Sequence, residues 1–266
     1  RHSTGIRNLQ LTQYKDIDVP LPPLAEQERI VAKLDAAFAE IDRAVNAVES
    51  KEAEATVLER RFLEKIFATP YPVTKVGDLG DVKSGGTPNS KEAAYWNGNI
   101  PWYSSGELNT LFAPNSEKFI TITGLNNSNA KLFPKDTLLV GMYDTAAMKM
   151  SILQQEATFN QAIVGIPPNE FASAEYLFYA LKFLKPKVLL ERRGVRQQNL
   201  SLAKIKNIDI PLPKSSVQNE IVEKLNAFHT EQASYQSVLT AKIERFQGLK
   251  SAILSQELQP PQSDAA

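Results

Sequence analysis

Apolar side chains recur at every third or fourth position in two long stretches of the chain. The first stretch covers residues 24–66 and contains neither glycine nor proline, whereas the second covers residues 216–256 and contains one glycine, Gly248. This spacing is typical of a helix with one apolar face, so it predicts two helices of about 40 residues, each roughly 60 Å long. The apolar positions are Ile30, Leu34, Phe38, Ile41, Val45, Val48, Ala55, Leu58, Phe62 and Ile66 in the first, and Ile221, Leu225, Phe228, Tyr235, Leu239, Ile243, Phe246, Leu249 and Ile253 in the second.

Two helices of equal length, each with one narrow apolar face, bury that face best against each other, which predicts a coiled coil. If the chain folds back between them, the pair is antiparallel. Gln232 falls within the second apolar face, where a polar side chain can fix the register of the helices. Gly248 costs a helix about 1 kcal/mol relative to alanine and marks a weak position.

The segment between the two helices, residues 70–213, follows a different pattern. Short strand-like runs at residues 118–123, 137–142 and 162–166 alternate with clusters of glycine, asparagine and proline that favour turns. Residues 174–190 have the apolar spacing of a short helix. We therefore expect an α/β (α+β) fold in which one globular domain of about 140 residues, a normal domain size, is flanked by the two long helices.

One sequence module occurs twice, at residues 8–34 and 199–225. The two copies read NLQLTQYKDIDVPLPPLAEQERIVAKL and NLSLAKIKNIDIPLPKSSVQNEIVEKL, and fourteen of the 27 aligned positions are identical. The copies lie much farther apart than the roughly 20–50 residues of a solenoid repeat. The repeat therefore predicts the same local structure twice, an extended segment that leads into a long helix.

Composition narrows the possible functions. The chain of 266 residues has a formal net charge of zero, no cysteine and two histidines. Disulfides, cysteine zinc sites and thiolate catalysis are excluded, and a histidine metal site is not expected. No apolar run is long enough to cross a bilayer and the start does not resemble a signal peptide, so we expect a cytoplasmic protein without membrane contact. Because the first residue is Arg1, we expect a fragment or a processed product.

Basic side chains are concentrated in one part of the chain. Residues 182–206 contain eight lysines and arginines against one acidic residue, Glu191, whereas residues 24–66 contain seven basic and ten acidic side chains. A concentrated basic segment indicates a polyanion site. A solvated surface is the alternative, and charge alone does not decide between the two.

The sequence lacks the common catalytic motifs. It contains no G-x-x-x-x-G-K-[ST] phosphate loop, no G-x-G-x-x-G loop and no target-base motif of an amino-methyltransferase. No serine has a suitable base partner among the two histidines. Asp78 and Asp81 could bind a metal, but such carboxylate pairs are common on protein surfaces. We therefore predict a chain without catalytic residues, metal or cofactor.

The central segment is better suited to binding a nucleic acid, because it combines cations with amides, hydroxyls and aromatic rings. Arginine, asparagine and glutamine match base edges, while lysine and the amides of glycine loops suit phosphate oxygens. Trp96 and Trp102 are more readily explained as core residues, and residues 126–129 as turn formers. The candidate DNA-binding residues are Lys83, Ser84, Gly85, Gly86, Thr87, Tyr103, Ser104, Lys131, Arg193, Arg196, Gln197 and Gln198. Lys83, Ser84, Thr87 and Lys131 are expected at the DNA backbone.

Several phrases of the sequence occur together in one known family. They are LGDVKSGGTP at residues 79–88, YWNGNIPW at residues 95–102, GLNNSNAK at residues 124–131 and FNQ at residues 159–161. The repeated I-D-[VI]-P-L-P, followed in each copy by a glutamine, is the last of them. With these phrases the chain resembles the specificity subunit of type I restriction-modification enzymes over nearly its whole length.

The resemblance implies a domain layout and a role. Residues 1–22 would end a preceding recognition domain, residues 23–69 would be the central helix and residues 70–213 the target-recognition domain. Residues 214–257 would be the distal helix and residues 258–266 a disordered tail. Such a subunit is non-catalytic and reads one half of a two-part site in double-stranded DNA, while its helices set the spacing between the halves.

The resemblance also implies partners. Methyltransferase subunits would dock on the chain and hold S-adenosylmethionine, and a restriction subunit would join through the complex. Because most of a first recognition domain is absent, the chain is either a fragment or a half-subunit that pairs with a second copy through its long helices. Two alternatives remain open, a coiled-coil scaffold whose central domain binds protein, and a nuclease or methyltransferase fused to helices.

Overall fold

The computed structural model describes residues 21–143, 146–193 and 199–258, together with Lys15. Two helices of 43 residues each, α2 (Leu24–Ile66) and α6 (Ser215–Glu257), confirm both predicted long helices. The chain divides into a helical unit, made by residues 24–55 of α2 and 232–257 of α6, and a mixed unit of residues 56–231. The expected end of a preceding domain and the expected disordered tail fall almost wholly outside the described residues.

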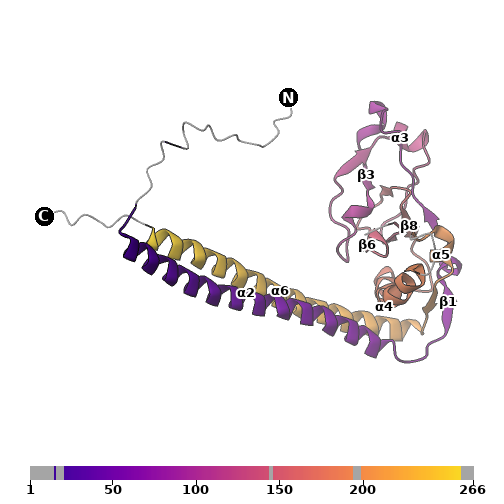
Figure 1. Ribbon diagram of the computed structural model, residues 1–266. Coiled ribbons are helices and arrows are strands. Elements are labelled where there is room, and N and C mark those ends of the chain that lie inside the picture. Colours follow the sequence, from indigo (N-terminus) through magenta and orange to yellow (C-terminus); the bar gives the residue numbers. More distant parts are fainter. Residues whose placement is uncertain (1–14, 16–20, 144–145, 194–198, 259–266) are drawn as a thin grey trace. The chain divides into compact units, whose positions relative to one another are not determined.

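In the helical unit, α2 and α6 lie side by side and run antiparallel (Figure 1). Nζ of Lys33 donates to Oε1 of Glu257 over 2.6 Å, and the side-chain amide of Gln232 donates to the carbonyl oxygen of Ala55 over 3.3 Å. As residue numbers rise along α2, those of the partners fall along α6. The predicted antiparallel coiled coil is therefore confirmed, with Gln232 bonded inside its seam.

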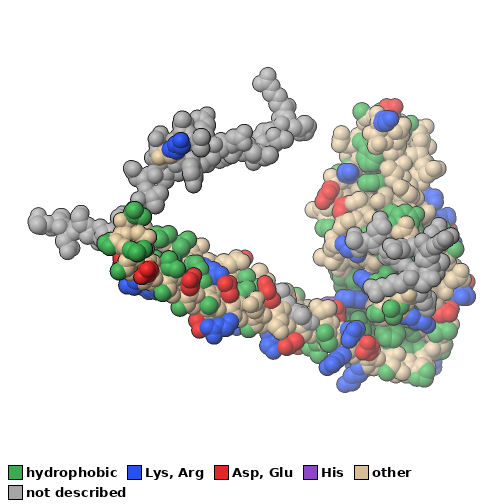
Figure 2. All heavy atoms as spheres, viewed as in Figure 1, with side chains coloured by type: hydrophobic (Ala, Val, Ile, Leu, Met, Phe, Trp, Pro, Cys, Tyr) green, Lys and Arg blue, Asp and Glu red, His purple; other side chains and the backbone are tan. Residues whose placement is uncertain are grey.

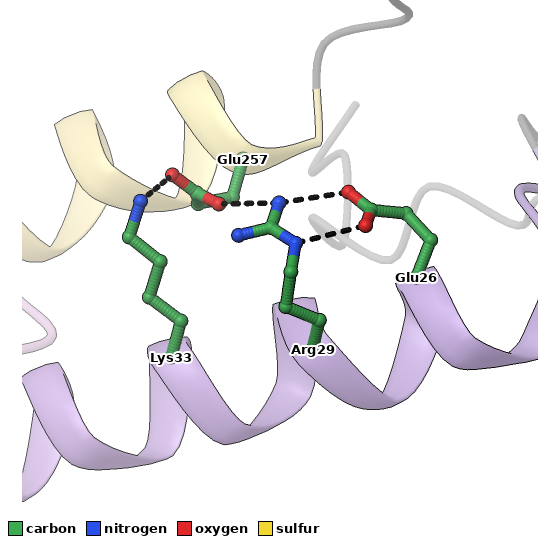
Figure 3. Close-up of polar contacts among 4 residues, drawn as sticks. All are labelled: Glu26, Arg29, Lys33 and Glu257. Carbon is green, nitrogen blue, oxygen red and sulfur yellow. Dashed lines mark hydrogen bonds and ion pairs between the residues drawn. The ribbon is translucent and has the colours of Figure 1, made fainter.

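Glu257 ties the last turn of α6 to α2 (Figure 3). Its carboxylate lies 2.6 Å from Nζ of Lys33 and 3.7 Å from Nη2 of Arg29. Arg29 is held in turn by two hydrogen bonds to the carboxylate of Glu26, of 2.7 and 2.8 Å. The Glu257 side chain is only 8% exposed, so two cations compensate a carboxylate that is largely withdrawn from water.

The seam between the helices follows a seven-residue repeat that the apolar pattern identified only in part. Leu58, Tyr235 and Leu249 were expected in the seam, but they are 57%, 45% and 47% exposed, so their assignment is wrong. The inward positions belong to the next residue in each case, and all three are polar: Glu59, Gln236 and Lys250. A search for hydrophobic residues alone cannot find them.

Gly248 lies on the exposed side of α6, where an added Cβ would meet no atom within 4 Å. Gly248→Ala is therefore expected to stabilise the helical unit by about 1 kcal/mol, because alanine loses less backbone entropy in a helix. Thermal unfolding followed by circular dichroism measures the effect. Ala252→Gly, at another exposed position of the same helix, is the matched control and should lower the melting temperature. A Gly248→Ala variant that melts at or below the wild-type temperature would contradict the prediction.

The described residues of the mixed unit form three small sheets. Their strands are β1 (Val73–Lys75), β2 (Lys83–Ser84), β3 (Trp96–Tyr103), β4 (Lys118–Ile120), β5 (Leu138–Gly141), β6 (Met150–Ile152), β7 (Thr158–Phe159), β8 (Ile163–Ile166) and β9 (Asp209–Pro211). One sheet has the order β2-β8-β5-β6, a second β4-β3-β7, and β1 pairs with β9. All pairs are antiparallel except β3 and β7.

The predicted strand runs are confirmed at β5 and β8, and only partly at residues 118–123. There β4 ends at Ile120, and Thr121 begins the short helix α3 (Ile122–Asn126). The hydroxyl of Thr121 accepts a hydrogen bond of 3.0 Å from the amide of Gly124, which is the action of a helix N-cap. The predicted helix at residues 174–190 is confirmed as α4 (Ala174–Arg193), and α5 (Leu202–Lys206) follows it. The described residues of the unit also form three short 3-10 helices: η1 (Val76–Leu79), η2 (Ala93–Tyr95) and η3 (Ser105–Glu107).

The main core of the mixed unit joins α4 to the ends of both long helices. Tyr176 and Leu181 of α4, Leu63 of α2 and Leu225 of α6 are each less than 5% exposed and belong to one hydrophobic cluster. This compact unit therefore extends beyond the expected limits of residues 70–213, because the long helices contribute their last and first turns to the core.

The repeated module is fully packed in its second copy. The side-chain amide of Gln218, 4% exposed, donates to the carbonyl oxygens of Pro213 (2.8 Å) and Phe171 (2.9 Å). The equivalent Gln27 donates to the carbonyl of Pro22 over 2.7 Å. The two copies thus share the bond that closes the turn before the helix, and the second copy adds a bond to the mixed unit.

Candidate nucleic-acid interface

A glycine loop follows β2 and is packed tightly against two other segments. A Cβ on Gly85 would lie 2.1 Å from the carbonyl oxygen of Phe159, and one on Gly86 would lie 2.1 Å from the carbonyl oxygen of Asn129. The amides of both glycines donate to carbonyl oxygens, Gly85 to Ile163 (3.1 Å) and Gly86 to Phe159 (2.9 Å). The two glycines are thus needed for close backbone approach, and their N–H groups are already used.

The side chain of Trp102 is hydrogen-bonded to this loop. Its indole nitrogen donates to the carbonyl oxygen of Gly86 over 3.0 Å, and its side chain is 6% exposed. Trp96 packs edge-on against it with ring centroids 5.2 Å apart, and the ammonium of Lys118 lies 5.9 Å from the ring centroid of Trp102. The interpretation of Trp102 as a core residue is confirmed.

The loop forms one wall of a cavity of about 640 Å³. Three segments that are distant in the sequence line it, the glycine loop, the turn before Phe133 and the residue that follows Asn160. The lining residues are Ser84, Gly85, Gly86, Thr87, Ser128, Asn129, Ala130, Lys131 and Gln161. Five of the candidate residues line the cavity: Ser84, Gly85, Gly86, Thr87 and Lys131. Lys83, the candidate that precedes Ser84, is not among the lining residues.

Two hydrogen bonds join the walls of the cavity. Nζ of Lys131 donates to the carbonyl oxygen of Ser84 over 3.0 Å, and the hydroxyl of Thr87 donates to Oε1 of Gln161 over 2.5 Å. Lys131, Thr87 and Gln161 are exposed, so the polar ends of the walls remain open to solvent.

Lys83, Tyr103 and Ser104 lie elsewhere. Lys83 is exposed and pairs with Asp81. Tyr103, at the end of β3, is 2% exposed and its hydroxyl donates to the carbonyl oxygen of Pro114 over 2.8 Å. The expected contact of Tyr103 with DNA is therefore contradicted, because its ring is buried in the core. Burial also raises the pKa of the Tyr103 phenol.

Ser104 caps the short helix η3. Its hydroxyl and its backbone amide both donate to Oε2 of Glu107, over 2.8 and 2.6 Å. Both groups are therefore engaged within the chain, and Ser104 has a local structural role as a helix cap.

The remaining candidates stay predictions. Arg193 is the last residue of α4, and its side chain lies outside the described part of the chain. Arg196, Gln197 and Gln198 lie in a segment that is not described at all.

Four residues of the cavity were not among the candidates: Ser128, Asn129, Ala130 and Gln161. Each belongs to a phrase that carries the family resemblance, so a signal was present in the sequence. What the sequence does not show is that these phrases meet at one cavity.

A second polar cluster lies where α4 meets the long helices. The carboxylate of Glu59 on α2 pairs with the ammonium of Lys182 on α4, and its Oε1 lies 3.0 Å from Nε2 of His229 on α6. Tyr179 stacks on the His229 ring with centroids 5.5 Å apart. Burial alone would raise the pKa of Glu59, but the contacts with His229 and Lys182 outweigh it and bring the pKa down to about 2.

Glu59 should therefore stabilise the mixed unit in a pH-dependent way. Its folded pKa of about 2 lies below the ordinary value of 4.5, so its contribution is fully present above pH 4.5 and disappears as the pH falls towards 2. Linkage gives a contribution of about 3 kcal/mol to the free energy of unfolding at neutral pH.

The measurement compares urea unfolding of the wild type and Glu59→Gln across this pH range. The variant should be less stable at pH 7, and the difference should shrink as the pH falls below 4.5. The matched control is Glu64→Gln, an exposed carboxylate on the same helix, which should behave like the wild type. A difference between wild type and Glu59→Gln that does not change with pH would contradict the prediction.

Among the described residues, no group of three or more histidine, aspartate or glutamate side chains could hold a metal ion. Within the same residues, no helix combines the length and apolar character needed to cross a membrane.

The family model and the curated relatives that this chain matches all belong to type I restriction specificity proteins. Residues 70–245 match the family described as the type I restriction modification DNA specificity domain. The specificity subunit of an Escherichia coli type I restriction enzyme is 26% identical over 175 residues, which is 64% of this chain and 43% of that protein. The MjaIX specificity subunit of Methanocaldococcus jannaschii is 28% identical over 163 residues, 59% of this chain and 38% of that protein. The chain thus spans about two fifths of the curated relatives that it matches.

Solved structures share the fold. A chain from a study of complex assembly in the type I R-M system superposes with a TM-score of 0.78 at 18% identity, covering 96% of this chain and 65% of that chain. The HsdS subunit from Thermoanaerobacter tengcongensis gives a TM-score of 0.59 at 18% identity, covering 97% of this chain and 64% of that chain. At these identities the likeness concerns the fold, and it agrees with the predicted sheet domain between two long helices.

Proposed function

Because the chain belongs to the type I restriction modification DNA specificity family, we propose that it is a non-catalytic DNA-recognition subunit of a type I restriction-modification complex. The mixed unit would read one half of a two-part site in double-stranded DNA. The observation that carries this proposal is the cavity at which three family phrases meet, because it brings Lys131, Thr87 and Gln161 together on an open, polar surface. Such a set of donors and one cation suits DNA.

Methylation and cleavage would reside in partner subunits. The chain has no recognisable catalytic motif, so S-adenosylmethionine would be held by a methyltransferase subunit and a restriction subunit would join the assembled complex. Large apolar side chains on the outside of the long helices support docking of a protein partner there. They are Val57 and Leu58 on α2, and Tyr235, Val238, Leu249 and Leu254 on α6.

The long helices would act as a spacer. A helix of 43 residues is roughly 65 Å long, which is close to two turns of B-DNA at about 34–36 Å per turn. Recognition domains at the two ends of such a helix pair could contact the same face of the duplex.

A second recognition domain would cover the first copy of the repeated module. Leu21 and Val31 are 83% and 55% exposed, whereas the equivalent Leu212 and Val222 pack against the core of the mixed unit. The same sequence is thus packed at one copy and open at the other. The covering domain would come from a longer form of the chain or from a second copy, and would read the other half-site.

The test of this function is direct DNA binding by the purified chain. A labelled duplex of random sequence should bind with an affinity that falls steeply between about 50 and 200 mM salt, as phosphate contacts require. Adding the cognate methyltransferase subunit should give a stable complex in light scattering. A chain that binds neither DNA nor the methyltransferase would instead support the alternative of a coiled-coil scaffold.

A further inference from the structure

We propose that the cavity between Thr87, Lys131 and Gln161 holds one phosphodiester group of the DNA backbone and does not read a base. This inference rests on the proposed DNA-binding function and names what this particular site binds. Figure 2 shows one face of the chain, with basic side chains spread over its surface. The character of the cavity itself follows from the residues that line it.

The lining of the cavity is rich in hydrogen-bond donors and carries positive charge. Among the described residues that line it, Lys131 is the single ionisable side chain and none is acidic. One of the three N–H groups of Lys131 is bonded to the carbonyl of Ser84, which leaves two for a ligand. A ligand that only accepts hydrogen bonds and is negatively charged fits this lining, as a phosphodiester does.

Thr87 determines which end of Gln161 faces the ligand. The Thr87 hydroxyl donates to Oε1 of Gln161 over 2.5 Å, so the amide oxygen is engaged and the NH₂ group supplies two further donors. No hydrogen bond to another described residue occupies that NH₂ group. Thr87 is thus a positioning residue, and Gln161 becomes a donor to an acceptor group.

The same bond argues against reading of a base. Glutamine recognises adenine through a bidentate pair that uses both its amide oxygen and its NH₂ group. With Oε1 turned towards Thr87 and bonded to it, the two N–H groups are the part of the Gln161 amide that is left unbonded. The amides of Gly85 and Gly86 are bonded within the chain, so the side chains of Lys131 and Gln161 provide the contact.

The experiment measures binding of a labelled random-sequence duplex by the full chain as a function of salt, for the wild type and two variants. Lys131→Met removes the cation and should lower the slope of log K against log salt by about one unit, as loss of one phosphate contact does. Gln161→Glu keeps the shape and the acceptor for Thr87 but places a negative charge in the cavity. It should weaken binding on the order of tenfold or more at low salt.

Lys242→Met is the matched control for Lys131→Met, because it removes the same charge from an exposed position on α6. It should leave both affinity and slope unchanged. Since Lys131 also anchors the carbonyl of Ser84, Gln161→Glu keeps the test valid if Lys131→Met fails to fold.

Two results would overturn the inference while the proposed function stands. In the first, the wild type binds in a salt-dependent way and both cavity variants bind like the wild type. In the second, the variants lose affinity for one DNA sequence and keep their affinity for random duplexes, which is the behaviour of a base-reading site. A wild-type chain that binds no DNA at all would refute the function and the inference together.

Discussion

Gly86→Ala is expected to destabilise the mixed unit by about 3 kcal/mol and to eliminate binding at the cavity. The added methyl group would lie 2.1 Å from the carbonyl oxygen of Asn129 and 2.6 Å from the amide nitrogen of Ala130. Backbone atoms on one side and Trp102 on the other leave the loop no direction in which to move, since the Trp102 indole donates to the Gly86 carbonyl.

Tryptophan fluorescence during urea unfolding measures this loss, because both tryptophans of the chain, Trp96 and Trp102, lie in the mixed unit next to the loop. Gly106→Ala is the matched control. A Cβ at Gly106 would meet only Oγ of Ser104 at 3.8 Å, an ordinary contact, so this variant should keep wild-type stability. Equal stability of the two variants would show that the glycine loop is less constrained than its contacts indicate.

The long helices were predictable because their signal is local and repeated many times. An apolar residue at every third or fourth position needs no knowledge of the partner. Which residues face the partner helix was harder to predict. Glu59 occupies an inward position because its carboxylate pairs with Lys182 and lies next to His229. Lys182 and His229 belong to α4 and α6, so the local pattern of α2 cannot predict that they contact Glu59.

The sheets and the cavity show the same limit more strongly. β1 pairs with β9, and β3 pairs in parallel with β7, across long separations in sequence. The phrases that contain Thr87, Lys131 and Gln161 were all recognised, but only the fold shows that they meet at one place. Tyr103 was misplaced for the opposite reason, because an aromatic phenol suits a DNA surface and a core equally well, and burial decides between them.

The two copies of the repeated module show which structure depends on the local sequence and which depends on the surrounding fold. Both copies form the proline turn closed by a glutamine and the start of a long helix. Beyond that, Leu225 in the second copy is fully buried in the core of the mixed unit, while the equivalent Leu34 is only half-buried. Two leucines at the same position of the same module should then differ in their contribution to stability.

Leu225→Ala is expected to reduce the free energy of unfolding of the mixed unit by about 3 kcal/mol, because it removes a fully buried side chain and leaves a cavity. Leu34→Ala is the matched variant and should cost about 1 kcal/mol, since its side chain keeps contact with water. Urea unfolding followed by tryptophan fluorescence measures the first, and circular dichroism of the helical unit the second. Equal losses of unfolding free energy would contradict the different burial of the two copies.

A second recognition domain that covers the first copy in the assembled complex would bury Leu34. Leu34→Ala should then lower the free energy of unfolding in the complex as much as Leu225→Ala does in the chain alone. An effect of Leu34→Ala that does not change on assembly would argue against such a covering domain.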